Sequence, residues 1–400
     1  MKRILISLVV LVFIGGIGSC IFLFYNYKKA EKNIIPVYEE KKKTYTEEAN
    51  EATLTLVGDL LFETNYYNAI NSGDDKEQYF HLVKDYFSKD DLSIGNMEVV
   101  IGNPNMPVRG GDNYNFSAPI WVGDLVSSLD FEVLSTANNH AYDQGSAGVI
   151  STIDYFRNHT DILTVGTYKT KEETTKQHIL EINGIRFGFI AYAMGTNVKI
   201  DKDHEYMVSL YKQSGSNKVT STDKARMKEE IEALNKNVDV TILLVHWGSE
   251  YTFEPNETQK ELALFFNSLG VDIIVGNHSH NIQPIEWIKN ENKTLVYYSL
   301  GNFVSADEYI ERTNETFNNA YQIGLLSSLV VTKENNHITI QNITTEPIIN
   351  YYDKNLRNFT LVPYSLYDEK YEMNHYRYNL GLSKEFITNI YEIVIPETFR

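Results

Sequence analysis

Strand-like and helix-like segments alternate along this 400-residue chain from residue 54 to about residue 304, and this alternation constrains the fold more than any other feature. Residues 54–57 form a short apolar run with β-branched side chains, which is typical of a buried strand. Residues 145–158 space their apolar side chains for one face of a helix. Strands and helices in alternation predict an α/β fold.

The remaining segments extend this pattern. The further predicted strands are residues 92–94, 131–136, 186–192, 240–245, 271–274 and 294–299. The further predicted helices are residues 77–88, 120–129, 223–236 and 257–269. The polar, irregular residues 201–222 predict a surface insertion. After residue 314 the alternation weakens, although residues 325–332 and 337–343 predict an antiparallel pair because only a short turn separates them.

An apolar run over residues 4–25 comes directly after the charged residues Lys2 and Arg3. A bilayer span needs about 20 apolar residues, so the run predicts an uncleaved signal anchor, residues 1–26, in the cell membrane. The alternative is a lipoprotein signal, in which Cys20 becomes the lipidated first residue. Because an N-terminal signal normally exports the chain behind it, we expect one membrane pass with the body outside the cytoplasm.

The sequence divides the rest of the chain into three parts. Residues 27–51 are charged and lack strong periodicity, which predicts a tether between the membrane and the body. Residues 52–304 contain the alternating segments and predict the core. Residues 305–400 hold the predicted strand pair and a tyrosine-rich tail that the sequence leaves poorly defined.

The chain is acidic and contains a single cysteine, Cys20. Its formal net charge is −17, and its first 43 residues are basic, so the predicted body is more acidic still. An acidic body argues against nucleic-acid binding, which depends on neutralising phosphates. One cysteine excludes an internal disulfide and a thiolate metal cluster, so any metal must be held by histidine, asparagine and carboxylate groups.

Polar side chains that can bind a metal follow five of the predicted strands. In open α/β sheets, functional groups gather at the carboxyl ends of the strands. Each segment alone is better explained as a turn, because asparagine and aspartate suit turns. Five such segments together predict one shared metal site. Their residues are Asp59, Asn96, Glu98, Asn139, His140, His246, His278 and His280.

His278 and His280 are the most informative pair in this set. They lie one residue apart, directly after the strand predicted at residues 271–274. Their imidazoles can both turn toward one point if the backbone there leaves the regular pleat of a strand. Imidazole, amide and carboxylate ligands together suit Mn²⁺, Zn²⁺ or Fe.

The order of the strand-end phrases resembles the five motifs of the metallophosphoesterase (calcineurin-like) superfamily. In detail the phrases are similar to the CapA/PgsA family of poly-γ-glutamate capsule synthesis proteins, over residues 52–304. The resemblance implies a sandwich of two mixed sheets flanked by helices, behind an N-terminal membrane helix. The phrases that carry it are Gly58-Asp59, Gly95-Asn96-Met97-Glu98, Ala137-Asn138-Asn139-His140-Ala141-Tyr142-Asp143-Gln144-Gly145, His246-Trp247-Gly248-Ser249-Glu250-Tyr251, Gly276-Asn277-His278-Ser279-His280 and Tyr298-Ser299-Leu300-Gly301-Asn302-Phe303.

The resemblance also implies roles for individual residues. His140 would contact the substrate or protonate a leaving group, and Asp143 would be its carboxylate neighbour. The implied metal ligands are Asp59, Asn139, His246, His278 and His280.

Two positions depart from the superfamily pattern. Leu61 occupies the place of the histidine in the Asp-x-His motif, and Asn96 replaces the aspartate that bridges two metals. A neutral amide bridges two cations poorly, but Glu98 can restore the charge from two residues away. We therefore expect one or two divalent ions, with Asn96 and Glu98 among the groups that hold them.

The resemblance implies a membrane-anchored component of poly-γ-glutamate capsule synthesis or export, with the polymer and a polyglutamate synthase complex as partners. A second hypothesis is an exported metal-dependent phosphoesterase or related hydrolase with an unrelated substrate. A third is a non-catalytic scaffold of a synthase complex, which the missing Asp-x-His histidine favours. The sequence leaves open whether the site is catalytic.

Overall fold

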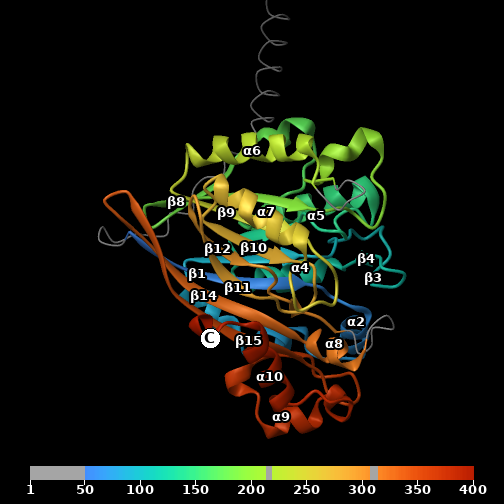
Figure 1. Ribbon diagram of the computed structural model, residues 1–400. Helices are drawn as coiled ribbons and strands as arrows, with labels where there is room; N and C mark the ends of the chain where they lie inside the picture. Colours follow the sequence, from blue (N-terminus) through green and yellow to red (C-terminus); the bar gives the residue numbers. More distant parts are fainter. Residues whose placement is uncertain (1–49, 213–218, 307–313) are drawn as a thin grey trace, which may run out of the picture. The chain divides into compact units, whose positions relative to one another are not determined.

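The structure is a computed structural model that describes residues 50–212, 219–306 and 314–400. Two β-sheets lie against each other, and helices cover their outer faces (Figure 1). This arrangement confirms the predicted α/β fold of two mixed sheets flanked by helices. The predicted membrane segment with Cys20 lies outside the described residues, as does the predicted tether up to residue 49.

The first sheet has eight strands, and its central strand runs parallel to some neighbours and antiparallel to another. Its members are β1 (Glu51–Leu60), β2 (Leu92–Met97), β5 (Val133–Ser135), β6 (Leu163–Val165), β13 (Asn302–Val304), β14 (Ile323–Glu334), β15 (His337–Tyr351) and β16 (Thr360–Pro363). The order is β16-β15-β14-β1-β2-β5-β6, and β13 pairs with the end of β1. β1 is parallel to β2 and β13 but antiparallel to β14.

The second sheet has six strands in the order β11-β12-β10-β9-β8-β7. Their bounds are β7 His178–Ile182, β8 Ile185–Ala193, β9 Val240–His246, β10 Ile273–Asn277, β11 Ile285–Lys289 and β12 Lys293–Tyr297. β8, β9, β10 and β12 are parallel, and the two outer strands are antiparallel. A separate short ribbon pairs β3 (Arg109–Gly110) with β4 (Phe116–Ser117).

Helices shield both sheets from solvent. Two of them, α6 and α7, lie on the outer face of the second sheet (Figure 1). An Asn256 capping box with Gln259 starts α7, as the sequence pattern of a helix N-terminus requires. The helices are α2 Thr64–Asn71, α3 Lys84–Lys89, α4 Ile120–Ser127, α5 Gly145–His159, α6 Ser221–Asn235, α7 Glu257–Ser268, α8 Glu315–Ala320, α9 Glu369–Asn374 and α10 Lys384–Val394.

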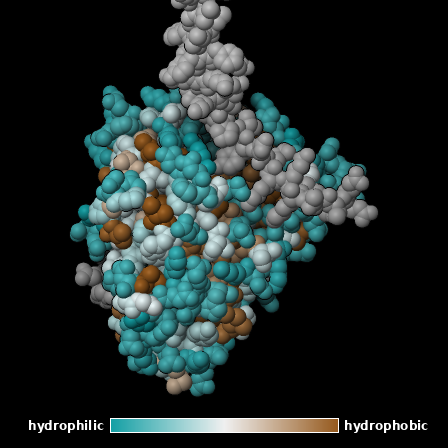
Figure 2. All heavy atoms as spheres, turned by 180° about the vertical axis from the view of Figure 1, so that it is seen from behind, coloured by the Kyte–Doolittle hydropathy of each residue, from teal (hydrophilic) through white to brown (hydrophobic). Residues whose placement is uncertain are grey.

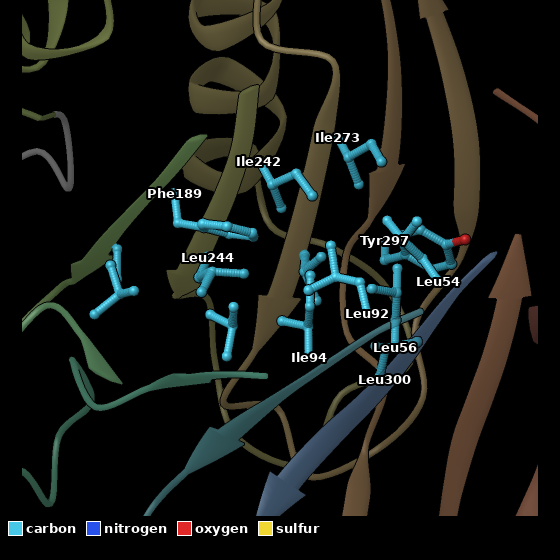
Figure 3. Close-up of a cluster of buried hydrophobic side chains, with 14 of the residues drawn as sticks. Leu54, Leu56, Leu92, Ile94, Phe189, Ile242, Leu244, Ile273, Tyr297 and Leu300 are labelled. Carbon is cyan, nitrogen blue, oxygen red and sulfur yellow. The ribbon is translucent and has the colours of Figure 1, made fainter. Parts of the chain in front are cut away.

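The largest apolar core lies between the two sheets. Leu56 of β1 and Ile94 of β2 face Leu244 of β9, and all three side chains are buried (Figure 3). Alternate residues of β9 point into this layer and the others pack under the helices, so the strand is buried on both faces, which is why it is recognisable as an apolar run. This packing fixes the positions of the strand ends, where the polar residues lie.

The C-terminal strands belong to the first sheet. The predicted antiparallel pair is confirmed as β14 and β15, and both strands are longer than predicted. β14 also pairs with β1, with Leu329 opposite Leu54. The tyrosine-rich tail forms β16, α9 and α10, and Tyr352 and Tyr367 are buried within it.

Two predicted segments differ from the structure. Residues 77–88 form a 3₁₀ turn (Lys76–Phe80) and the short α3 instead of one helix, because Val83 and His81 make i→i+3 hydrogen bonds that break the α-helical ladder. The predicted surface insertion at residues 201–222 is only partly on the surface. Met207 and Val208 are buried in the core between the sheets, which a polar local composition does not reveal.

The surface of the described residues carries scattered apolar side chains. Figure 2 shows one face on which hydrophilic side chains dominate. Scattered exposed apolar residues are normal for a folded protein. Within residues 50–212, 219–306 and 314–400, no helix is both long enough and apolar enough to span a bilayer.

We predict that Asp272→Asn stabilises the protein at alkaline pH. Burial raises the pKa of Asp272 to about 6, although its Oδ2 accepts a hydrogen bond from the Thr241 N–H at 2.8 Å. The contribution of this carboxyl to stability is therefore present below its ordinary value of 3.8 and is lost as the pH rises through about 6. Because the group is partly exposed, we expect a gain of about 1–2 kcal/mol at pH 8.

Urea unfolding of wild type and variant at pH 8 and pH 4 measures this difference. Asparagine keeps the oxygen that accepts from Thr241, so the two proteins should differ little at pH 4. An equal difference at both pH values would contradict the assigned pKa.

Candidate metal centre

The strand ends of both sheets meet at one place. Backbone pairing sets Asp59 beside both Asn96 and Asn302, and it sets His246 beside Asn277. The His278 N–H donates to Asp59 Oδ2 (3.3 Å) and links the two sheets. The structure thus brings the predicted metal ligands together in a buried group, here called the strand-end cluster, which consists of Asp59, Asn96, Glu98, Asn139, His246, His278 and His280.

Two glycines allow the strands to approach closely enough for this cluster to form. A Cβ on Gly58 would lie 1.9 Å from the carbonyl oxygen of Gly301, and one on Gly276 would lie 2.3 Å from that of Tyr298. The register of β1 against β2 also shifts just before Asp59, and such irregularities re-aim side chains. Gly58 and Gly276 therefore allow neighbouring backbone segments to pack closely at the strand ends.

The backbone leaves regular pleating at the histidine pair, as the sequence required. His278 has φ +99° and His280 has φ +55°, both in the left-handed region. Such conformations are uncommon for non-glycine residues, cost about 1–3 kcal/mol and gather at functional sites. Two successive turns of this kind let side chains one residue apart face the same cluster.

The first set of converging atoms surrounds His246. Its Nε2 lies 2.8 Å from Asn139 Oδ1, 3.0 Å from His278 Nδ1 and 3.3 Å from Glu98 Oε1. Atoms that bind one ion at about 2.0–2.2 Å lie roughly 3 Å apart. The spacing of these four atoms is therefore that of a ligand set.

The second set contains Asp59, Glu98 and His280, whose ligand atoms lie within 4.8 Å of one another. His280 Nδ1 is 3.0 Å from Asn302 Oδ1 and 3.5 Å from Asp59 Oδ2. With a proton on Nδ1, the Nε2 atom is free for a metal and lies 4.0 Å from Glu98 Oε1. Glu98 belongs to both sets.

The carboxylate of Glu98 is the strongest sign that these donors fit a metal. The residue is 0 % exposed, and neither of its oxygens has a hydrogen-bond partner among the described residues. Burial, followed by the charge of Asp59, raises its pKa well above the ordinary value. A buried, unsatisfied carboxylate is costly, and a cation bound between the two sets would satisfy it.

Two of the three histidines of the cluster are held in the neutral form that suits metal binding. Burial lowers the pKa of His246 to about 3 and lowers the pKa of His278 well below its ordinary value. Both are therefore neutral at pH 7, as a metal ligand must be. Burial acts the same way on His280, but the hydrogen bond and charge of Asp59 outweigh it and raise that pKa.

Asn96 is engaged with protein groups at both ends of its amide. Its Nδ2 donates to Asp59 Oδ1 (2.7 Å), and its Oδ1 accepts from Asn138 Nδ2 (3.3 Å). These bonds orient the Asp59 carboxylate. A direct ligand role for Asn96 stays a prediction.

His140 lies beside the cluster and is paired with Asp143. Its Nδ1 is 2.8 Å from Asp143 Oδ2, which also accepts from the Phe116 N–H at 2.7 Å. The Phe116 ring packs edge-on against the imidazole, with centroids 4.6 Å apart. Asn197 Nδ2 is 3.4 Å from His140 Nε2, and the Asn197 N–H donates to Asn139 O at 2.7 Å. The predicted pair is therefore formed.

Three residues of the site had no predicted role. Asn302 orients His280, Asn197 contacts His140, and the Glu250 carboxylate lies within 4.8 Å of ligand atoms of His278 and His280. Asn302 and Glu250 lie in the strand-end phrases named in the sequence analysis. Their position shortly after a predicted strand could therefore have marked them as candidate site residues. Asn197 lies in the loop after β8, where no local pattern marks it.

The fold and the cluster define a class of protein: a two-sheet α/β sandwich with a candidate divalent-metal centre at its strand ends. The family described as "Bacterial capsule synthesis protein PGA_cap" matches residues 53–307, which include the whole strand-end cluster. The chain belongs to this family. The resemblance read from the strand-end phrases is thereby confirmed.

Two curated relatives come from Bacillus species. The chain is 28% identical over 265 residues to the PGA biosynthesis protein CapA of Bacillus subtilis (strain 168), covering 66% of this chain and 65% of that protein. It is 27% identical over 314 residues to the capsule biosynthesis protein CapA of Bacillus anthracis, covering 77% and 72%. The match thus spans slightly less than two thirds of the Bacillus subtilis relative.

Two solved structures are similar at 13% sequence identity. One is a phosphatase from Mycoplasma pneumoniae, with a TM-score of 0.43 over 75% of this chain and 94% of that one. The other is the calcineurin-like phosphoesterase YfkN from Bacillus subtilis, with a TM-score of 0.42 over 86% and 96%.

We predict opposite effects of Glu98→Gln on the metal-free and metal-loaded protein. Glutamine keeps nearly the same shape and removes the cost of burying this carboxyl, whose pKa is raised by burial, so the metal-free variant should be more stable than wild type by about 1–3 kcal/mol. The variant should gain less stability than wild type from added Mn²⁺ or Zn²⁺, because a shared ligand is lost. Thermal unfolding in EDTA and with added metal measures both effects.

The matched control is Glu254→Gln, which changes an exposed glutamate outside the cluster. It should behave like wild type in both conditions. Equal metal-induced stabilisation of wild type and Glu98→Gln would contradict the shared-ligand role.

Proposed function

We propose that this chain is a membrane-anchored protein of poly-γ-glutamate capsule synthesis or export, working with a synthase complex. The observation that carries the proposal is the family match, which spans every residue of the strand-end cluster. The names of the two Bacillus relatives, a PGA biosynthesis protein and a capsule biosynthesis protein, support it.

We further propose that the strand-end cluster holds one or two ions of Mn²⁺, Zn²⁺ or Fe. Asn139, His246 and His278 would hold one of them, Asp59 and His280 the other, and Glu98 would serve both. A bound ion supplies a Lewis acid for an acyl or phosphoryl oxygen and lowers the pKa of water. The unsatisfied Glu98 oxygens support this assignment.

His140 is placed to move a proton at a substrate bound beside the cluster. Asp143 Oδ2 lies 2.8 Å from Nδ1 of the ring, so a substrate would approach Nε2, which Asn197 Nδ2 contacts at 3.4 Å. Asp143 is itself fixed by the Phe116 N–H, and the Phe116 ring covers one edge of the imidazole. A buried carboxylate behind a histidine holds its tautomer and stabilises its charged form. The target would be the polymer or an acyl-phosphate-like intermediate.

The acidic composition bears on how a polyanion would be handled. A chain with a formal net charge of −17 repels an anionic polymer as a whole. Cations in the strand-end cluster would create a local positive site within this negative field. The proposal is therefore a confined site or a partner role, without broad polymer binding.

We also propose that residues 1–26 anchor the chain in the membrane with the body outside the cytoplasm, the alternative being lipidation at Cys20. The support is the apolar run over residues 4–25, which is long enough to span a bilayer. Protease added to intact cells should degrade the body, and full protection would contradict the exported orientation.

We predict that deleting the gene from its own bacterium abolishes surface poly-γ-glutamate. Wild type should restore the polymer, whereas the double variant His278→Ala/His280→Ala should not, because one ligand of each set is removed. Polymer released from washed cells is the measurement. Immunoblots of membrane fractions establish that the variant is present at wild-type level.

Restoration of polymer by the double variant would show that the metal centre is dispensable and would favour the scaffold hypothesis. Unchanged polymer in the deletion strain would contradict the capsule function itself.

A second candidate function is an exported metal-dependent phosphoesterase with an unrelated substrate. The buried His140–Asp143 pair beside the cluster is the observation that favours it. An oriented histidine–carboxylate pair serves proton transfer in catalysis, which a non-catalytic scaffold does not perform.

We predict that, if this second function holds, the purified protein hydrolyses bis-p-nitrophenyl phosphate with Mn²⁺ and that His140→Ala slows it by about 10²–10⁴-fold. His140 is a proposed proton-transfer group and not a ligand, so metal content should be retained. Release of nitrophenol and metal analysis of the same samples give both readouts. His159→Ala, on α5 and outside the cluster, is the control.

A further inference from the structure

A third carboxylate reaches the strand-end cluster from a loop that joins the second sheet to α7. Glu250, His278 and His280 offer ligand atoms within 4.8 Å of one another. Glu250 is partly exposed, whereas the other ligand-type residues of the cluster are buried. It therefore approaches the two histidines from the solvent side.

The loop that carries Glu250 is fixed to the histidine turn on both sides of the residue. The Trp247 N–H donates to Asn277 O at 3.2 Å, and the Tyr251 N–H donates to Ser279 O at 2.8 Å. Ser279 lies between the two histidines, so the second bond sets the neighbour of Glu250 directly against their turn. Tyr251 has φ +56°, which places it in the left-handed region. This anchoring holds the carboxylate in place.

The carboxylates around Glu250 would be stabilised by a nearby positive charge. The charge of Glu250 acts on Glu98, which also adjoins Asp59, and in the described part of the chain no lysine or arginine forms an ion pair with any of the three carboxylates. Burial and Asp59 raise the pKa of Glu98, and the charge of Glu250 adds to this rise. The two Glu98 oxygens, buried and unsatisfied, point to a cation independently of Glu250.

We infer that Glu250 is a metal ligand of the strand-end cluster, supplied by the β9–α7 loop on the solvent side; this inference rests on the metal centre of the proposed function. It supplies a donor in a cluster where Leu61 occupies a position that resembles the place of a histidine ligand. Leu61 is buried among apolar side chains and offers no donor atom. His278 belongs to the first set of donor atoms and His280 to the second. Because the Glu250 carboxylate lies near both histidines, it adjoins both sets.

This position has a chemical consequence. Glu250 brings the number of carboxylates at the cluster to three, with Asp59 and Glu98, so the bound ions keep less net positive charge than with two. It is also the carboxylate of the three that is partly exposed to solvent. The centre is thereby less suited to a phosphate dianion than one with two carboxylates, and more suited to a singly charged or neutral acyl group.

Cobalt binding to the full chain in detergent tests the inference. Metal-stripped wild type, Glu250→Gln and Glu254→Gln are titrated with Co²⁺, and the visible absorption and calorimetric affinity are recorded. Glu250→Gln should bind at least one Co²⁺ about tenfold or more weakly, with a changed absorption spectrum, because an oxygen donor is lost. Glu254→Gln changes an exposed glutamate of the same loop that belongs to none of the candidate ligand groups among the described residues, so it should match wild type. Glu250→Asp should recover part of the affinity.

The same titration separates this inference from the wider proposal. If Glu250→Gln binds Co²⁺ with wild-type stoichiometry, affinity and spectrum while His278→Ala/His280→Ala has lost it, Glu250 is not a ligand and the metal centre stands. If wild type itself binds no Co²⁺, both the inference and the metal centre fail. Neither result alters the polymer measurement on intact cells, which tests the capsule function separately.

Discussion

The burial of two carboxylates, Asp59 and Glu98, where the two sheets meet is the constraint on which the rest of the site depends. Both are 0 % exposed, and negative charge in an apolar interior is costly unless it is compensated. Asp59 accepts hydrogen bonds from the Asn96 side chain and from the His278 backbone N–H. The Glu98 oxygens accept no hydrogen bond from the described residues. The side chains of the cluster are therefore fixed in position, but the negative charge of its carboxylates is not balanced by protein groups. A bound cation would balance it.

The apolar layer between the sheets makes this arrangement possible. Leu56, Ile94 and Leu244 fix β1, β2 and β9 against one another a short distance before the polar strand ends. Rigid strands hold ligands more accurately than loops do. The solvent-side group, Glu250, comes from a loop, yet two backbone hydrogen bonds tie that loop to the histidine turn. The part of the site nearest to solvent is thus still positioned by the sheet.

Local patterns predicted the elements whose apolar residues either repeat with a helical period or run without interruption through a strand. α5 and β9 were recognisable because their apolar residues repeat with the period of a helix or fill a strand. Residues 77–88 failed because the chain tightens into 3₁₀ hydrogen bonds, and residues 201–222 failed because Met207 and Val208 reach a core formed by distant strands. For residues 201–222, tertiary contacts overrode local composition. Glu250 stands in a phrase already singled out, but its approach to His278 and His280 depends on the fold and is not visible in the sequence.

The sequence by itself determined the chemistry available to this protein: histidine, amide and carboxylate donors without thiolates, set after successive strands in phrases that identify the family. Only the tertiary structure decided which atoms converge, that Glu98 is shared by two sets of donors, and that Nδ1 of His280 faces Asn302. The physical reason is that donor types are properties of residues. Their meeting depends instead on strand order and register across two sheets, and long-range packing sets both.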